Sequence, residues 1–194
     1  SPVISPNGKL IAFNLEERRP LAYTPDQIAI MDLNGNNMRL LTKDLDGDAN
    51  NLHWANDSKS IFFTYDERGI RKIGQVTTKG KFKEIIKGLG GTTLGRPYLS
   101  GGFHLNNNTI AYTHGTSERP ANIAVINEEE VQILTALNDD LLSYRKLGKV
   151  NEITYKSSFD EQEIQGWYIT PPDFDPSKKY PLILEIHGGP HLAY

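Results

Sequence analysis

One short pattern, a polar turn followed by an apolar strand, recurs along the chain at an interval of about 50 residues. It reads SPNGKLIAF at residues 5–13, ANDSKSIFF at 55–63, and LNNNTIAY at 105–112, where one residue is deleted. Recurrence at a fixed interval of this length is typical of repeat architectures, in which each repeat forms one supersecondary unit. The sequence therefore predicts three copies of one small structural unit.

Each copy also contains further strand-forming segments, separated by polar turns. Second strands are predicted at 27–33, 70–76 and 121–126, third strands at 39–42, 82–87 and 131–135, and leading strands at 50–55 and 95–105. Four short antiparallel strands per repeat are the signature of a β-propeller blade. The alternative is a β-sandwich with regular turns. It is disfavoured because sandwiches rarely repeat the same turn residues at a fixed interval.

The three predicted blades do not make a complete propeller. A closed ring usually needs about four to eight blades, and the first copy begins only four residues after residue 1. We therefore expect a partial propeller that lacks most of its first leading strand. Its open blade edges are expected to favour self-association.

The pattern changes near residue 140, where a polar connector at 135–150 has no partner in the repeats. After it, strands predicted at 151–157 and 163–172 form a hairpin, and the second ends at a proline pair. The apolar run PLILEI at 181–186 predicts a strand covered on both faces, as in a parallel or mixed sheet. The sequence thus predicts a propeller domain with its connector at 1–148 and the start of an α/β domain at 149–194.

Composition narrows the range of partners. The chain carries 21 Lys and Arg against 24 Asp and Glu, a net charge of −3, without a basic stripe. Nucleic acid is therefore not an expected partner. No window reaches the roughly 18 uncharged apolar residues that predict a membrane span. The compartment stays open between cytoplasmic and periplasmic or secreted.

No cofactor or metal ion is predicted from the residues. The chain has no cysteine, which excludes disulfides and thiolate chemistry. His53, His104 and His114 fall on or near predicted strands without the close pairing of metal ligands. We interpret them as packed or surface residues.

The apolar run at 181–186 leads directly into His187-Gly188-Gly189-Pro190. In acyl transfer a negative oxygen develops on the intermediate, and a backbone N–H must approach it to about 3 Å. Glycines allow that approach and the unusual backbone angles it requires. The alternative interpretation is a tight turn that follows a strand.

Together, the repeats and this motif resemble the prolyl oligopeptidase superfamily of serine peptidases, in its acylaminoacyl peptidase and bacterial dipeptidyl peptidase branch. The most specific stretch is 133–191. The resemblance implies a propeller that caps an α/β-hydrolase domain with a Ser, Asp, His triad, and a short peptide as substrate. It implies that the Gly189 amide is an oxyanion donor, and that Gly188 and His187 shape the loop.

The same resemblance implies that the triad lies outside this chain. The sequence contains no G-x-S-x-G motif, and in this family all three triad residues follow the HGGP motif. The chain alone is therefore expected to be inactive. The fold class predicted is mostly β: about three four-stranded blades, then the first strands of an α/β-hydrolase domain.

Two questions stay open at this stage. Glu16 and Glu17 are candidates for binding a substrate's free amino terminus, as acidic propeller residues do in dipeptidyl peptidases of this superfamily. The alternative is a solvated loop in which the charges of Arg18 and Arg19 balance those of the two glutamates.

The other possible function class for the chain is a non-enzymatic β-propeller binding module. Such a module would have no use for an oxyanion loop.

Overall fold

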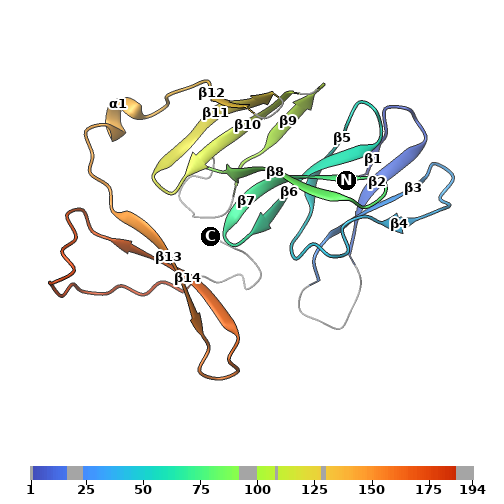
Figure 1. Ribbon diagram of the computed structural model, residues 1–194. Coiled ribbons are helices and arrows are strands. Elements are labelled where there is room, and N and C mark those ends of the chain that lie inside the picture. The colour runs from blue at the N-terminus through green and yellow to red at the C-terminus, as the bar shows by residue number, and fades with distance from the viewer. Residues whose placement is uncertain (1, 17–23, 92–99, 108, 128–129, 187–194) are drawn as a thin grey trace.

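The computed structural model describes residues 2–16, 24–91, 100–107, 109–127 and 130–186 (Figure 1). Nearly all of its regular structure is β, as predicted. The strands are β1 (Val3–Ile4), β2 (Leu10–Leu15), β3 (Gln27–Asp32), β4 (Arg39–Leu40), β5 (Asn50–Trp54), β6 (Ser60–Glu67), β7 (Ile70–Thr77), β8 (Phe82–Leu89), β9 (Phe103–Asn106), β10 (Thr109–Thr116), β11 (Arg119–Asn127), β12 (Glu130–Ile133), β13 (Lys149–Lys156) and β14 (Glu163–Thr170). The helix α1 (Asp139–Leu142) is a single turn with no buried residue.

The first twelve strands form the three predicted four-stranded units. Strands β1 to β4 pair in chain order, as do β5 to β8 and β9 to β12, and every pairing is antiparallel. In Figure 1 the units lie side by side in chain order, coloured blue, green and yellow. The three-unit architecture predicted from the repeat is confirmed.

The second and third units are joined, which the repeat pattern did not indicate. Leu89 at the end of β8 pairs with His114 of β10, so that β5 to β12 form one eight-stranded sheet. A Cβ on Gly115 would lie 3.0 Å from the carbonyl carbon of Gly90. Glycine at position 115 therefore permits the close approach of the two backbones that makes this join.

The first two polar turns of the repeat share one backbone conformation. The amide of Gly8 donates to the carbonyl of Ser5 at 2.8 Å, and the amide of Ser58 donates to that of Ala55 at 2.9 Å. Gly8, Ser58 and Asn107 each have a positive φ, of 68°, 59° and 51°. The first two copies therefore repeat one turn geometry, whereas in the third copy, which has one residue fewer, Asn106 pairs directly with Thr109.

These turns also connect neighbouring units. The amide of Asn7 donates to Ser58 Oγ at 3.1 Å, and Asn56 Nδ2 donates to Asn107 Oδ1 at 2.6 Å. The indole of Trp54 donates to the carbonyl of Val3 at 3.0 Å. The two partners of each pair are 51 positions apart in the sequence. This is about one repeat length, so each hydrogen bond joins one unit to the next.

Two apolar clusters fill the spaces between the units. One lies between the first and second units and includes Ile28, Ile61 and Phe63, all with no exposed surface. The other joins the second and third units through residues such as Ile73 and Tyr112. Because each cluster draws side chains from two units, neighbouring units stabilise one another.

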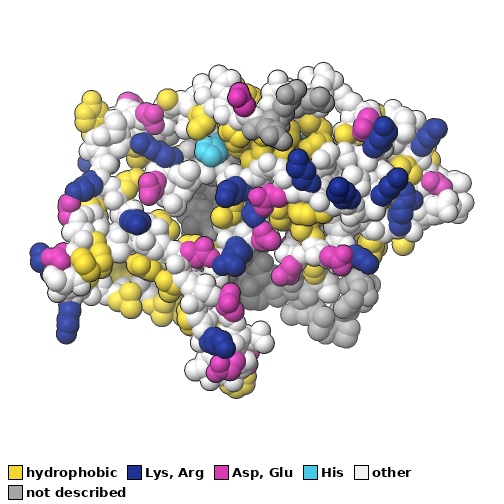
Figure 2. All heavy atoms as spheres, in the orientation of Figure 1, with side chains coloured by type: hydrophobic (Ala, Val, Ile, Leu, Met, Phe, Trp, Pro, Cys, Tyr) yellow, Lys and Arg dark blue, Asp and Glu magenta, His cyan; other side chains and the backbone are white. Residues whose placement is uncertain are grey.

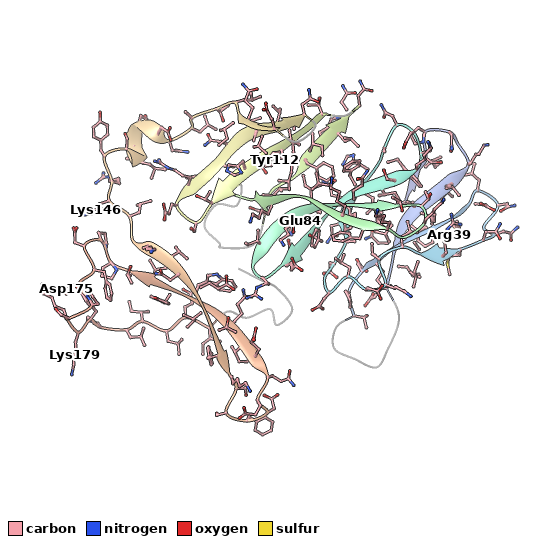
Figure 3. The ribbon with its side chains drawn as sticks, viewed as in Figure 1. Arg39, Glu84, Tyr112, Lys146, Asp175 and Lys179 are labelled. Atoms are coloured by element: carbon pink, nitrogen blue, oxygen red, sulfur yellow. The ribbon has the colours of Figure 1, made fainter. Side chains whose placement is uncertain are left out.

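A polar network covers the outer part of the second unit, where Figure 3 labels Glu84 on β8. The carboxylate of Glu84 accepts hydrogen bonds from Lys72 Nζ at 2.7 Å and from the Tyr65 hydroxyl at 3.3 Å. Burial raises the pKa of Tyr65 to about 12. Figure 2 shows acidic and basic side chains interspersed over this face of the molecule.

After the third unit, the connector leads into the hairpin of β13 and β14. Its register runs from Lys149 paired with Thr170 to Lys156 paired with Glu163. The second strand ends at Thr170, directly before the proline pair, as predicted. No helix in the described part of the chain is long and apolar enough to cross a membrane.

The prediction of a strand at 181–186 is wrong for this structure. The segment has no regular secondary structure, and Leu182 and Ile183 are 88% and 92% exposed. An apolar run becomes a buried strand only when neighbouring strands bond to it and other elements cover its faces. No described segment pairs with it.

Candidate functional site

The candidate site is the end of the propeller units that faces the β13–β14 hairpin. Successive strands are antiparallel, so the connection between the second and third strands lies at the same end of every unit. The β6–β7 turn contacts the hairpin directly through Arg68 and Gly69. The chain after β2, which contains Glu16, leaves its own unit at the corresponding end.

Gly69 and Trp167 make the closest contact between the two parts. A Cβ on Gly69 would lie 2.7 Å from the Cζ2 and Cη2 atoms of the Trp167 indole. Gly69 also has a φ of +67°, a conformation that costs other L-residues about 1–2 kcal/mol. The indole therefore rests on a turn that only glycine fits without strain.

An ion pair lies beside this contact. Arg68 Nη2 donates to Glu152 Oε1 at 2.7 Å, and Gln165 Nε2 donates to the same oxygen at 2.6 Å. The hydrogen bond from Arg68, followed by that from Gln165, lowers the pKa of Glu152. Both charged side chains are about half exposed, so the ion pair contributes little to the free energy of folding. It connects the β6–β7 turn to the hairpin at a defined position.

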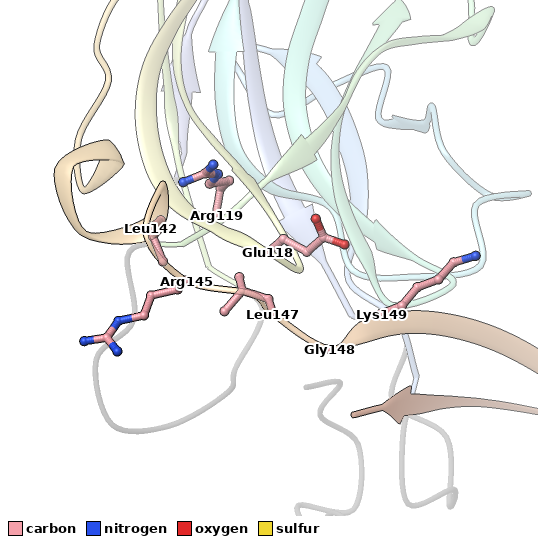
Figure 4. Close-up of a pocket in the computed structure, with 7 residues that line it drawn as sticks. All are labelled: Glu118, Arg119, Leu142, Arg145, Leu147, Gly148 and Lys149. Atoms are coloured by element: carbon pink, nitrogen blue, oxygen red, sulfur yellow. The ribbon is translucent and has the colours of Figure 1, made fainter. Parts of the chain in front are cut away.

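A small hollow of about 190 Å³ lies where the connector passes the third unit (Figure 4). It is lined by Glu118, Arg119, Leu142, Arg145, Leu147, Gly148 and Lys149. Arg119 Nη1 lies 3.4 Å from Asp139 Oδ1. This contact places the start of β11 beside α1, but it is a long ion pair without a hydrogen bond from Nη1, so it contributes little stability.

A larger hollow of about 620 Å³ lies between the second and third units and the hairpin. Its lining includes the apolar side chains of Ile70, Leu89, Val150 and Trp167. A volume of this size lies within the range of sites for small ligands. The site therefore consists of a fixed contact at Gly69 with a hollow next to it.

The structure tests the predicted site residues only in part. His187, Gly188, Gly189 and Glu17 lie outside the described residues, so their roles stay predictions. Glu16 is exposed at the end of β2, and its Oε1 accepts a hydrogen bond from Thr24 Oγ1 at 3.4 Å.

Two further acidic residues, Asp26 and Asp48, lie near Glu16, which the sequence pattern did not indicate. The amide of Asp26 donates to Asp48 Oδ1 at 2.8 Å. Burial, then Asp48, then Glu16 raise the pKa of Asp26. The acid-rich stretch at 44–48 is visible in the sequence. Nothing in the sequence, however, indicated that this stretch would pack beside Asp26, just before β3.

The histidines do not form a metal site with the residues described. Among these residues, no three His, Asp or Glu side chains lie close enough together to hold a metal ion. The rings of His53 and His104 are near each other, and His114 lies on the wall of the larger hollow.

Comparison with known proteins gives relatives across nearly the whole chain. The dipeptidyl-peptidase 5 of Porphyromonas gingivalis is 28% identical over 192 residues, which is 97% of this chain and 27% of the relative. No family model matches the sequence. The chain thus spans about a quarter of the length of this relative.

Solved structures share the fold. The acylaminoacyl peptidase of Pyrococcus horikoshii matches 88% of this chain with 25% of its own, at a TM-score of 0.67 and 23% identity. The β-propeller domain of the Trilobed protease from Pyrococcus furiosus matches 69% of this chain with 37% of its own, at a TM-score of 0.52 and 19% identity. The propeller fold and the resemblance to the prolyl oligopeptidase superfamily are confirmed.

Proposed function

We propose that this chain, which resembles a segment of prolyl oligopeptidase-type peptidases, is part of a serine peptidase that hydrolyses short peptides. The observation that carries the proposal is one sequence relationship. A dipeptidyl-peptidase 5 matches the chain over 97% of its length, through the repeats and into the stretch that ends in HGGP. In such an enzyme, residues 1–148 would form the last propeller blades with their connector, and 149–194 would begin the catalytic domain.

In this proposal the chain supplies part of the oxyanion site. The backbone amide of Gly189 donates to the oxygen that becomes negative in the transition state, while Gly188 and His187 shape the loop. A serine elsewhere in the parent protein is the nucleophile, and a histidine held by an aspartate accepts its proton. His187 is not that base, because it belongs to the oxyanion loop.

Substrate selection would come from the propeller. Blades placed over a catalytic site admit short peptides and exclude folded proteins by size. The acidic group of Glu16, Asp26 and Asp48 supports a role for this face in attracting a free amino terminus, since it places negative charge at the end of the first unit. Dipeptidyl or acylaminoacyl peptide substrates are the classes to compare.

The test uses the full-length parent protein. It is treated with a phosphonylating reagent that modifies only activated serines, and hydrolysis of dipeptidyl and acylaminoacyl chromogenic substrates is then followed. We expect labelling of one serine and loss of hydrolysis in proportion to labelling. A full-length protein that hydrolyses neither substrate and takes up no label would contradict the proposal.

The second candidate is a binding propeller without catalytic activity. The repeats alone are compatible with it, because a propeller serves binding proteins as well as enzymes. The HGGP stretch favours the peptidase. In the test above, an unlabelled protein that still binds peptides would favour the binding module.

A further inference from the structure

The hollow between the two units and the hairpin has a composition that favours a particular ligand. Among the described residues, its lining includes Arg71, Lys87 and His114 but no aspartate or glutamate. Apolar side chains, with Trp167 among them, make up much of the remaining wall. An apolar wall with basic groups and no acid fits a ligand that has an apolar body and a negative end.

His114 supplies a hydrogen-bonding group without a protein partner in the described part of the chain. Its Nδ1 atom is buried and makes no hydrogen bond. A buried polar atom in this state destabilises the fold unless a ligand or water satisfies it. The imidazole edge meets the Tyr112 ring, with centroids 6.0 Å apart, which fixes the ring's orientation.

The space beside this nitrogen is left by a glycine. A Cβ on Gly88, which also lines the hollow, would lie 3.9 Å from His114 Nδ1. Gly88 has a φ of +87°, so its backbone bends in a way that side chains disfavour. No side chain at position 88 therefore covers the nitrogen.

Of the two cations in the wall, only Lys87 lacks an ion pair among the described residues, and the carboxylate whose pKa its charge helps to lower, that of Glu84, lies outside the lining. Arg71 is engaged by Asp66 through two hydrogen bonds, Nε to Oδ1 at 2.8 Å and Nη2 to Oδ2 at 2.9 Å. Lys87 is exposed and forms no ion pair within the described part of the chain. Exposed Lys87 is thus the charged group that an anion entering the hollow would meet first, and the buried Nδ1 of His114 lies behind the surface of the same wall.

We propose that this hollow binds the carboxylate end of a short peptide whose last side chain is apolar. The side chain packs against Trp167, Ile70 and Val150, Lys87 balances the charge, and His114 donates from Nδ1 to a carboxylate oxygen. This goes beyond the proposed function, because it assigns a site for the carboxyl end of a peptide. Binding there needs no hydrolysis.

The experiment is isothermal titration calorimetry on the full 194-residue chain with three probes: the N-acetylated dipeptide Leu-Phe as the free acid, the same dipeptide as its C-terminal amide, and octanoate. We expect the acid to bind about tenfold more tightly than the amide, since hydrogen bonds to an ionised acceptor are roughly twice as strong as those to a neutral one. Octanoate shares the carboxylate but has no peptide groups or aromatic ring, and it is expected to bind more weakly than the acid.

Variants locate the site. Lys87→Gln should weaken binding of the acid about two- to fivefold, as expected for an exposed charge, and His114→Phe, which keeps a ring and removes the donor, should weaken it about tenfold. Lys83→Gln, also exposed on β8, and His104→Phe, exposed on β9, are the matched controls and should leave binding unchanged. If His114→Phe unfolds the chain, Lys87→Gln still tests the site, because the Lys87 side chain is exposed and its replacement should not affect folding.

Several results would overturn the inference. These are equal binding of acid and amide, equal binding of octanoate and the dipeptide acid, an equal loss in the control variants, or no binding at millimolar concentration. None of them would remove the proposed peptidase activity, which is measured by serine labelling of the parent protein.

Discussion

The imidazole rings of His53 and His104 meet edge to face across the boundary between the second and third units, with centroids 6.0 Å apart. They occupy corresponding places on the leading strands β5 and β9. His53 also packs on the Phe103 ring at 4.8 Å and shares a 3.1 Å hydrogen bond with Asn51 Oδ1. One ionisable ring is thus half-buried at a contact between units.

This contact predicts a dependence of stability on pH. Burial, followed by the charge of His104, lowers the pKa of His53 below its ordinary value of 6.5. A lowered folded pKa means that the stability provided by neutral His53 is present above about pH 6.5 and is lost as the pH falls through the folded pKa. We expect His53→Asn to show a smaller loss of stability between about pH 7.5 and pH 5 than the unmodified chain.

The measurement is the urea unfolding midpoint at the two pH values. His104→Asn is the matched control, because it removes the neighbouring charge and leaves His53 buried, so it should reduce the pH dependence only in part. A His53→Asn variant with the full pH dependence of the unmodified chain would assign the effect to other groups.

The proposed oxyanion role of Gly189 predicts a kinetic effect in the full-length parent. Valine at this position introduces a branched side chain and restricts the backbone that should donate. We expect kcat to fall about 10²- to 10³-fold with little change in KM. Gly102→Val is the control, since a Cβ on Gly102 would meet no atom within 4 Å. A folded Gly189→Val enzyme with near-normal kcat would remove Gly189 from the mechanism.

The contact of Trp167 with Gly69 predicts a coupling between the propeller and the hairpin. Gly69→Ala should destabilise the chain by about 1–2 kcal/mol through its positive φ alone, and by more because its methyl group meets the indole. Adding Trp167→Ala should remove the clash between the new methyl group and the indole, so that part of the lost stability is recovered. The cost of the positive φ should remain. Urea unfolding of the four chains in this double-mutant cycle gives the coupling. Additive effects would show that the two residues do not interact in solution.

The isolated chain is predicted to be inactive and prone to association. It contains no G-x-S-x-G motif, so turnover of a peptide substrate that scales with purified chain would contradict the assignment of the triad to the rest of the parent. Exposed apolar side chains on the edge strand β12, such as Val131 and Ile133, favour pairing between copies. Light scattering that shows a monomer at high concentration would contradict the predicted association.

Sequence patterns predicted the elements of this fold better than their contacts. The four-stranded units and the hairpin followed from short alternating segments and their turns, which are local properties. The join at Leu89 and His114 depends on glycine backbones that approach each other from different strands, and no periodicity encodes it. The run at 181–186 was predicted to be a strand because its composition suits burial, but composition does not supply the neighbouring strands. The Trp167 contact with Gly69 was missed for the same reason, since it joins two distant turns of the chain.

The hydrogen bonds between residues 51 positions apart connect each unit only to the next in the described structure. Such a row behaves as a chain of nearest-neighbour couplings, so a perturbation should weaken with each boundary it crosses. Loss of the Trp54 indole, for example, should speed amide hydrogen exchange in the first two units and leave the third nearly unchanged. In such a row, we expect that a whole repeat can be added or removed, because the change alters only the contacts at the two boundaries of that repeat.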